Sequence, residues 1–113
     1  TVEGMCGIRD QAEEKIQWLY DQGVRIASLC WNDENALATG VKGTVTRGLT
    51  EEGRKAVRKM DELGMILDVS HTNEKTFWDM AVTLPTWLAW SIWPSVLISW
   101  ISLRIMRRRW ARI

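Results

Sequence analysis

The sequence is poor in the residues that build disulfide scaffolds and cysteine-based metal sites. It has two cysteines, Cys6 and Cys30, and one histidine among 113 residues. Two cysteines exclude a disulfide framework and a cysteine zinc cluster, because each of these needs more sulfur atoms at regular spacing. We expect both to stay reduced and to fill small gaps in the core, which fits a cytoplasmic protein. No basic segment followed by an apolar run opens the sequence, so no signal peptide is predicted.

Acidic residues are absent after Asp79, and this absence divides the chain. Residues 1–79 contain 14 Asp or Glu and 10 Lys or Arg, a balance of −4, whereas residues 80–113 contain five Arg and no acid, a balance of +5. Six of the eight tryptophans also lie from position 78 onward. We therefore predict a body, residues 1–82, and a Trp- and Arg-rich tail of different character, residues 83–113.

The body alternates short apolar runs with amphipathic segments. Apolar runs ending at Val2 and covering residues 24–30 and 65–71 predict strands, and helical spacing of apolar residues predicts helices over 11–22, 51–63 and from 72 or 73 through 82. Asp10 and Thr50 are the expected N-caps, and Gly23 follows the first helix where a left-handed residue is favoured. The order of strands and helices predicts an α/β fold with about three parallel strands.

Polar residues follow each predicted strand, at the edge where parallel α/β proteins place their chemistry. Glu3 follows the first strand, Trp31 and Asn32 follow the second, and His71 ends the third. From position alone, non-functional roles stay open for two of these residues. His71 could be a structural histidine, and Glu3 could be a solvated acid at the surface. Asp68, inside the third strand, is expected to cap a neighbouring helix or loop. The charged run over residues 51–62 is predicted to be the solvated face of a helix.

Three segments together resemble one enzyme family. They are VEGM (2–5), GVRIASLCWNDENALATG (23–40) and RGLTEEGRKAVRKMDELGMILDVSHTNEKTFWD (47–79). In this order and spacing they resemble the membrane (renal) dipeptidase family of zinc peptidases, in its bacterial branch, over about residues 1–80. The resemblance implies a (β/α)8 TIM-type barrel that hydrolyses dipeptides, in some members with a D-residue or a blocked end, and that uses two zinc ions.

The resemblance also implies roles for the residues at the strand ends. Glu3 matches the carboxylate that bridges the two metals, and His71 matches a histidine ligand of the second metal. A bridging carboxylate neutralises part of the metal charge, and two ions together lower the pKa of an attacking water. Trp31 and Asn32 match substrate-pocket positions, although renal-type members carry a histidine at the Trp31 position.

Other parts of the family pattern have no match in this sequence. These are the His-x-Asp pair of the first strand, the histidine of a later S-H-S motif and the Asp of a late G-S-D-F motif. Two ligands from separate strands do not complete a two-metal site. We therefore predict a fragment of a zinc dipeptidase, with about three of the barrel's eight strands, that is inactive as written. Homo-oligomerisation of the parent enzyme is left open.

Three hypotheses account for the tail. An uncharged stretch followed by arginines predicts a membrane helix through residues 84–103, and hence a non-catalytic, membrane-anchored protein. Alternatively, the tail comes from a shifted reading frame, since the steps from residues 87–88 to 98–99 permit V-G-V-E-H-L-A-I-G-S-D-F, which resembles the family's late barrel strand. A third hypothesis is a basic tail that binds nucleic acid through residues 107–109, but no nucleic-acid-binding fold supports it. We favour the shifted frame and expect no nucleic-acid partner.

Overall fold

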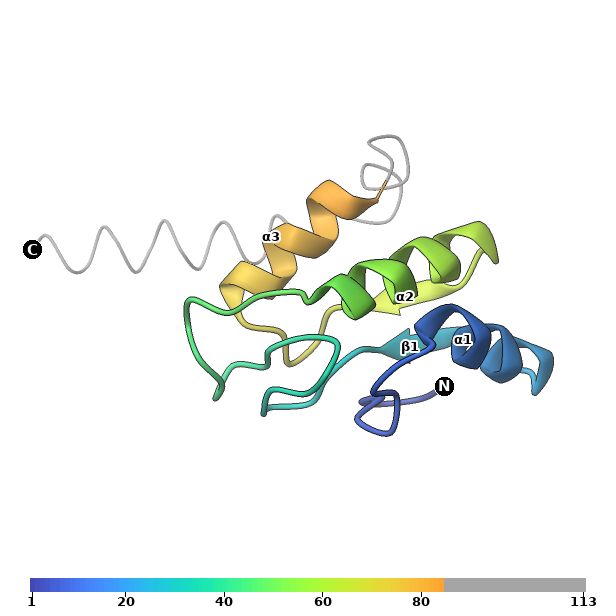
Figure 1. The fold of residues 1–113 in the computed structure, drawn as a ribbon, viewed down its shortest axis with the longest axis horizontal. Coiled ribbons are helices and arrows are strands. Elements are labelled where there is room, and N and C mark those ends of the chain that lie inside the picture. Colours follow the sequence, from blue (N-terminus) through green and yellow to red (C-terminus); the bar gives the residue numbers. More distant parts are fainter. Residues whose placement is uncertain (85–113) are drawn as a thin grey trace, which may run out of the picture.

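A computed structural model describes residues 1–84, which form an α/β unit with three helices and two parallel strands (Figure 1). The elements follow in the order α1 (Ala12–Asp21), β1 (Ile26–Ser28), α2 (Glu51–Glu62), β2 (Ile66–Asp68) and α3 (Glu74–Thr83). The helices begin and end within two residues of their predicted bounds, whereas both strands are shorter than predicted. The predicted apolar tail helix and the three hypotheses for the tail concern residues beyond position 84. These residues lie outside the described part.

The sheet is parallel, as predicted, but smaller. β1 and β2 pair in the register Ile26↔Ile66, Ala27↔Leu67, Ser28↔Asp68. The expected first strand is reduced to a single parallel bridge from Val2 to Ala27, held by two backbone hydrogen bonds of 3.0 Å. β1 is therefore central, with Val2 on one side and β2 on the other. Within residues 1–84 the prediction of about three strands holds for order and direction but not for strand number.

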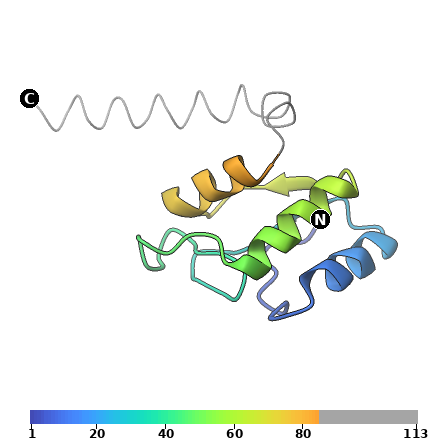
Figure 2. The same cartoon turned by 45° about the horizontal axis from the view of Figure 1, so that its top comes forward.

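The core lies between the sheet and the helices, and α2 is its centre. α2 contacts α1, α3 and β2, and the two ribbon views show α1 and α2 lying side by side (Figures 1 and 2). Side chains of the three helices and of β1 with the residue after it are buried together, among them Ile16, Ala27, Leu29, Ala56, Val57, Met60 and Met80, and Leu67 of β2 packs against them partly buried. Cys30 belongs to this core, as predicted. The same prediction for Cys6 was wrong, because Cys6 is exposed in the turn that the Ile8 N–H to Met5 O bond closes.

Two helices begin at side-chain caps that the sequence makes visible. Thr50 Oγ1 accepts the Gly53 N–H at 3.0 Å at the start of α2, as predicted. Asn73 Oδ1 accepts the Thr76 N–H at 2.8 Å. Of the two predicted starting residues, Asn73 and Thr72, the N-cap of α3 is therefore Asn73. Gly23 follows α1 with φ 97°, the left-handed conformation that was predicted for it.

The predicted Asp10 cap of α1 was wrong. Gln11 occupies the N-cap in a left-handed conformation, φ 50°, and makes no side-chain cap bond. Asp10 pairs instead with Lys15, and the Ala12 N–H donates to Glu52 Oε2 from α2 at 3.2 Å. A carboxylate from a neighbouring helix thus replaces the local cap, because a negative charge is favourable at a helix N-terminus.

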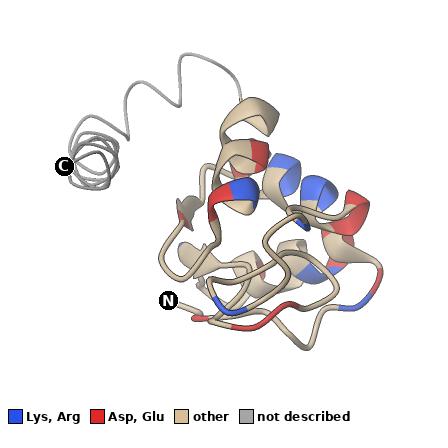
Figure 3. Cartoon of the chain, turned by 90° about the vertical axis from the view of Figure 1, so that its left-hand side faces the viewer, with Lys and Arg blue, Asp and Glu red and all other residues tan. Residues whose placement is uncertain are grey.

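The charged residues of α2 pair along the helix, as predicted for a solvated face. Ion pairs join residues three positions apart: Glu51–Arg54, Glu52–Lys55 and Lys59–Glu62. Such exposed pairs contribute little stability each. Figure 3 marks the positions of Lys, Arg, Asp and Glu along the chain by colour. None of the helices in residues 1–84 combines the length and hydropathy that a bilayer crossing requires.

Candidate metal and substrate site

Three of the residues predicted at strand ends meet at one point. His71 Nε2 lies 2.9 Å from Glu3 Oε1, and His71 Nδ1 lies 3.2 Å from Asn32 Oδ1. These contacts join positions 68 and 39 residues apart in the chain. The parallel sheet explains the meeting, because the carboxyl ends of neighbouring parallel strands share one edge. The imidazole ring therefore lies between a carboxylate on one side and an amide oxygen on the other.

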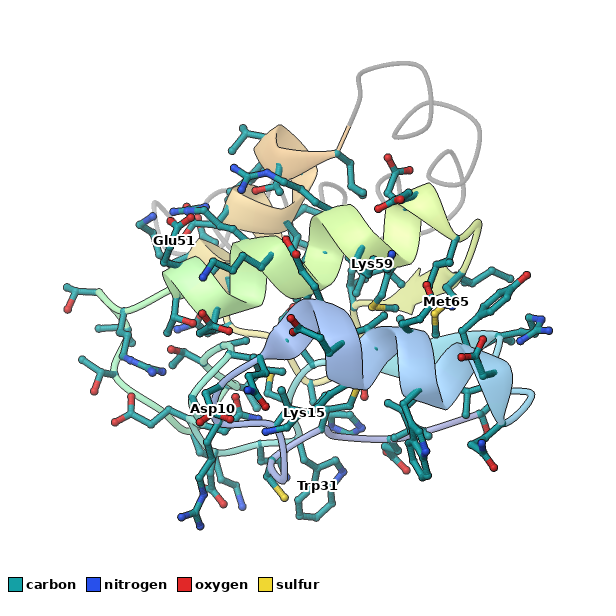
Figure 4. All side chains as sticks on the ribbon, turned by 45° about the vertical axis from the view of Figure 1, so that its right-hand side comes forward. Asp10, Lys15, Trp31, Glu51, Lys59 and Met65 are labelled. Carbon is teal, nitrogen blue, oxygen red and sulfur yellow. The ribbon has the colours of Figure 1, made fainter. Side chains whose placement is uncertain are left out.

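Trp31, the fourth predicted residue, covers one side of this cluster. Its ring centroid lies 5.6 Å from that of His71, with the two ring planes tilted by 47°. The tryptophan is 55% exposed, and Figure 4 shows its indole projecting away from α1 and α2. The Glu3 side chain is 65% exposed and that of His71 30% exposed. The cluster is thus open to solvent on the Glu3 side, and the outer face of the Trp31 ring is exposed as well.

His71 has an unusual backbone conformation. Its φ is 69°, in the left-handed region that residues other than glycine rarely adopt and that costs about 1–3 kcal/mol. The Val41 N–H donates to the His71 carbonyl at 2.9 Å, and Gly40 forms a bridge with Thr72. Asp68 Oδ1 accepts the Ser70 N–H at 2.9 Å, so Asp68 caps this loop, as predicted. Strain that neighbours hold in place is typical of functional sites.

Gly40 is a site residue that the sequence analysis missed. A Cβ at this position would overlap the backbone carbonyl oxygens of Trp31 and Asn32. The Gly40 N–H donates to Asp33 O at 3.1 Å, and the Lys42 N–H donates to Asn32 O at 2.8 Å. The loop therefore folds back on its own beginning, which fixes the direction of the Asn32 side chain. The signal in the sequence was the glycine-rich composition of residues 31–49.

A buried polar network behind the site was also missed. The Thr39 N–H donates to Thr76 Oγ1 at 3.2 Å, and that hydroxyl donates to Thr39 O at 2.9 Å. Asn73 Nδ2 donates to the carbonyl oxygens of Thr44 and Arg47, at 3.1 and 2.9 Å. These bonds tie the N-terminus of α3 to the loop after β1. No local sequence pattern announces them, because the partners are 26 to 37 residues apart.

The donor atoms at the centre suit part of a transition-metal site. An imidazole nitrogen and a carboxylate oxygen are ligands that zinc and related ions use in proteins. Nε2 of His71 and Oε1 of Glu3 face each other at 2.9 Å. Within residues 1–84, however, no three His, Cys, Asp or Glu side chains gather closely enough to hold an ion. The chemistry of these two donor atoms therefore fits a contribution to a metal site, but not a complete one within residues 1–84.

Comparison with known proteins identifies the family. Residues 1–86 match the family model of the membrane dipeptidases, peptidase family M19. The chain belongs to this family. The family assignment made from the sequence motifs is thus confirmed.

Two similar proteins match these residues over part of their length. An uncharacterised dipeptidase of Schizosaccharomyces pombe is 46% identical over 63 residues, which are 54% of this chain and 15% of that protein. An uncharacterised Klebsiella pneumoniae protein from the pqqA 5′ region is 36% identical over 86 residues, which are 71% of this chain and 31% of that protein. The chain therefore spans less than a third of these relatives.

Two solved structures have a similar backbone over part of their length. A metallopeptidase from Rhodobacter sphaeroides, solved with a phosphinate mimic of the dipeptide L-Ala-D-Ala, superposes with a TM-score of 0.55 at 32% identity. The match covers 62% of this chain and 22% of that one. A Pseudomonas aeruginosa amidohydrolase superposes with a TM-score of 0.64 at 27% identity, over 72% of this chain and 24% of that one.

Proposed function

We propose that this chain is a segment of a zinc-dependent dipeptidase, in which Glu3 and His71 are ligands of a two-metal centre. The observation that carries the proposal is the 2.9 Å approach of Glu3 Oε1 to His71 Nε2 in a chain of the membrane dipeptidase family. Both atoms are metal donors, and both lie at the edge of the sheet where parallel α/β enzymes keep their sites. The positive φ of His71 adds support, because strained residues concentrate at such sites.

Each residue has a chemical task in this proposal. When bound, the metal pair supplies a polarised water for attack on the peptide bond. Glu3 provides a carboxylate that offsets the charge of the ions, and His71 provides a neutral nitrogen in a fixed orientation. Trp31 shields one side of the imidazole and offers an exposed apolar surface to the substrate. Asn32 is the polar residue beside it on the substrate side.

The proposed substrate is a dipeptide. The Rhodobacter sphaeroides relative was solved with a mimic of L-Ala-D-Ala, and this supports a small peptide with an apolar side chain. The exposed indole of Trp31 next to His71 suits such a side chain. Dipeptide specificity would then depend on this surface together with residues beyond this chain.

The rest of the proposed enzyme lies outside this chain. We place the described strands in a (β/α)8 barrel whose other strands carry the remaining metal ligands. The parallel register of β1 and β2 and the share of 15–31% of the relatives' lengths support this placement. Since two ligands do not complete a two-metal site, we expect the isolated chain to hydrolyse no dipeptide.

A chimera tests the proposal. Residues 1–84 would replace the matching segment of the Rhodobacter sphaeroides metallopeptidase, and hydrolysis of L-Ala-D-Ala would be followed with and without added zinc. We expect zinc-dependent hydrolysis that His71→Ala and Glu3→Gln each lower by more than about 100-fold. Trp18→Ala, at an exposed position of α1, is the matched control and should leave the rate unchanged. Equal rates in the His71→Ala and Trp18→Ala chimeras would contradict the metal-ligand assignment.

A further inference from the structure

We propose that Asn32 is a positioning residue that acts through His71. Its side-chain oxygen, placed to accept a hydrogen bond from Nδ1, would hold the ring so that Nε2 is turned toward Glu3 and toward the proposed metal. This inference rests on the proposed function and adds to it, because it gives Asn32 a task at the metal rather than at the substrate. It depends on the two ring contacts and on the loop that holds Asn32.

The two nitrogens of His71 face partners of different kinds. Asn32 Oδ1, 3.2 Å from Nδ1, is an amide oxygen and can only accept a hydrogen bond. Glu3 Oε1, 2.9 Å from Nε2, is also an acceptor when it is ionised, so the two contacts of the metal-free ring do not select a tautomer. With a metal on Nε2 the ring proton must be on Nδ1, and Asn32 Oδ1 is the acceptor placed to hold it there.

One loop holds both the side chain and the backbone of His71. Asn32 at the start of the loop contacts the ring, and the Val41 N–H at its end donates to the His71 carbonyl at 2.9 Å. The Lys42 N–H fixes the Asn32 carbonyl at 2.8 Å, and Gly40 packs against the same backbone. Asn32 is therefore not a mobile surface amide. Its position is set by the loop that also holds the strained backbone of His71.

Loss of this contact has a defined consequence. A ring without a partner at Nδ1 populates both tautomers and turns more freely, so fewer molecules present a lone pair at Nε2. Replacing groups that orient a metal-bound histidine lowers metal affinity by about 10- to 100-fold. Asn32→Leu removes the acceptor at nearly constant size, whereas Asn32→Asp keeps it. The pair of variants separates the hydrogen bond from the space that the side chain fills.

His71 is the single histidine of the chain, which makes a direct measurement possible. The full chain, labelled with ¹⁵N, would be titrated with zinc chloride, and the two imidazole nitrogen shifts would report the affinity and the nitrogen that binds zinc. We expect zinc at Nε2 and a proton on Nδ1 in the wild type and in Asn32→Asp. In Asn32→Leu we expect about 10-fold weaker binding and zinc divided between Nε2 and Nδ1. Trp31→Leu, which removes a ring contact without a hydrogen bond, should keep zinc at Nε2.

Each outcome decides the matter. Unchanged affinity and nitrogen choice in Asn32→Leu, or equal losses in Asn32→Leu and Asn32→Asp, would overturn the role of Asn32 and leave the metal-ligand role of His71 intact. Binding of zinc through Nδ1 in the wild type would overturn it without any variant. If the wild-type His71 nitrogens do not respond to zinc, this inference fails, whereas the metal-ligand proposal is decided separately by the chimera, in which the other ligands are present.

Discussion

The conformation of single residues explains how a short chain holds its site. His71 has φ 69°, and the cost of that conformation is offset by the Val41 N–H bond to its carbonyl and by the contacts of its ring. Those contacts depend in turn on Gly40, which lets the loop return to the backbone of Trp31 and Asn32. Position 40 requires glycine because it is small: a Cβ at this position would overlap backbone atoms of Trp31 and Asn32.

Substitution of Gly40 by alanine tests this argument at the residue scale. The added Cβ would overlap the carbonyl oxygens of Trp31 and Asn32, which are backbone atoms and cannot turn aside as a flexible side chain can. We expect Gly40→Ala to lower the free energy of unfolding by about 1–3 kcal/mol in urea denaturation. Gly7→Ala is the matched control, since nothing lies within 4 Å of a Cβ at Gly7. A loss in the control as large as in Gly40→Ala would show that the close approach is not the cause.

At the scale of elements, what could be predicted follows from the range of the interactions. Thr50 begins α2 through a bond to a residue three positions away, and a local pattern of this kind is visible in a sequence. The start of α1 was predicted wrongly because its anionic partner is Glu52, 40 residues from Ala12. Strand lengths also escaped prediction, because strand pairing depends on neighbouring segments rather than on apolar content.

The candidate site was predictable only where it depends on the order of the strands along the chain. The parallel order of strands placed Glu3, Asn32 and His71 at one edge, and the structure brings all three together. Gly40 was missed because the sequence shows three glycines in this loop and does not show which of them lies against the backbone of Trp31 and Asn32. The metal and substrate roles of these residues remain predictions.

The junction between α3 and the loop before α2 gives a pH-dependent prediction. Burial alone would raise the pKa of Asp79, but hydrogen bonds from Lys75 and the Leu49 N–H outweigh it and hold the pKa below its ordinary value of 3.8. The unfolded chain therefore binds the proton more readily than the folded one. The stability that ionised Asp79 contributes is present above pH 3.8 and is lost as the pH falls through its folded pKa.

Urea denaturation at pH 6 and at pH 3 would measure this contribution. We expect Asp79→Asn to be less stable than the wild type at pH 6 and to lose less stability on acidification, because an amide does not titrate. Asp10→Asn is the control: the pKa of Asp10 is also lowered, by a side-chain hydrogen bond from Lys15, but this pair is exposed and stabilises little. If Asp79→Asn and the wild type lost the same stability, the Asp79 contacts would have no part in the acid response.

At the scale of the whole molecule, the outer edge of β2 is an unprotected part of the sheet. β2 pairs with β1 on one side, and within residues 1–84 no strand pairs with its other side. Ile66 on this strand is 47% exposed, and Val82 on α3 is 77% exposed. An unpaired strand with exposed apolar side chains is a template for pairing with another chain. In the proposed enzyme, further strands of the barrel would cover this edge.

Self-association of the full chain is therefore expected, and Ile66 is the residue to change. Ile66→Lys places a charge on the open edge, where lysine is a common means of preventing edge pairing. We expect the wild-type mass in light scattering to rise with protein concentration, and the rise to be smaller in Ile66→Lys. Trp18→Lys removes a 61% exposed side chain from α1, away from the edge, and should behave as the wild type. A wild-type chain that stays monomeric at every concentration would contradict the expectation that this edge is open to pairing, and with it the view that these strands belong to a larger barrel.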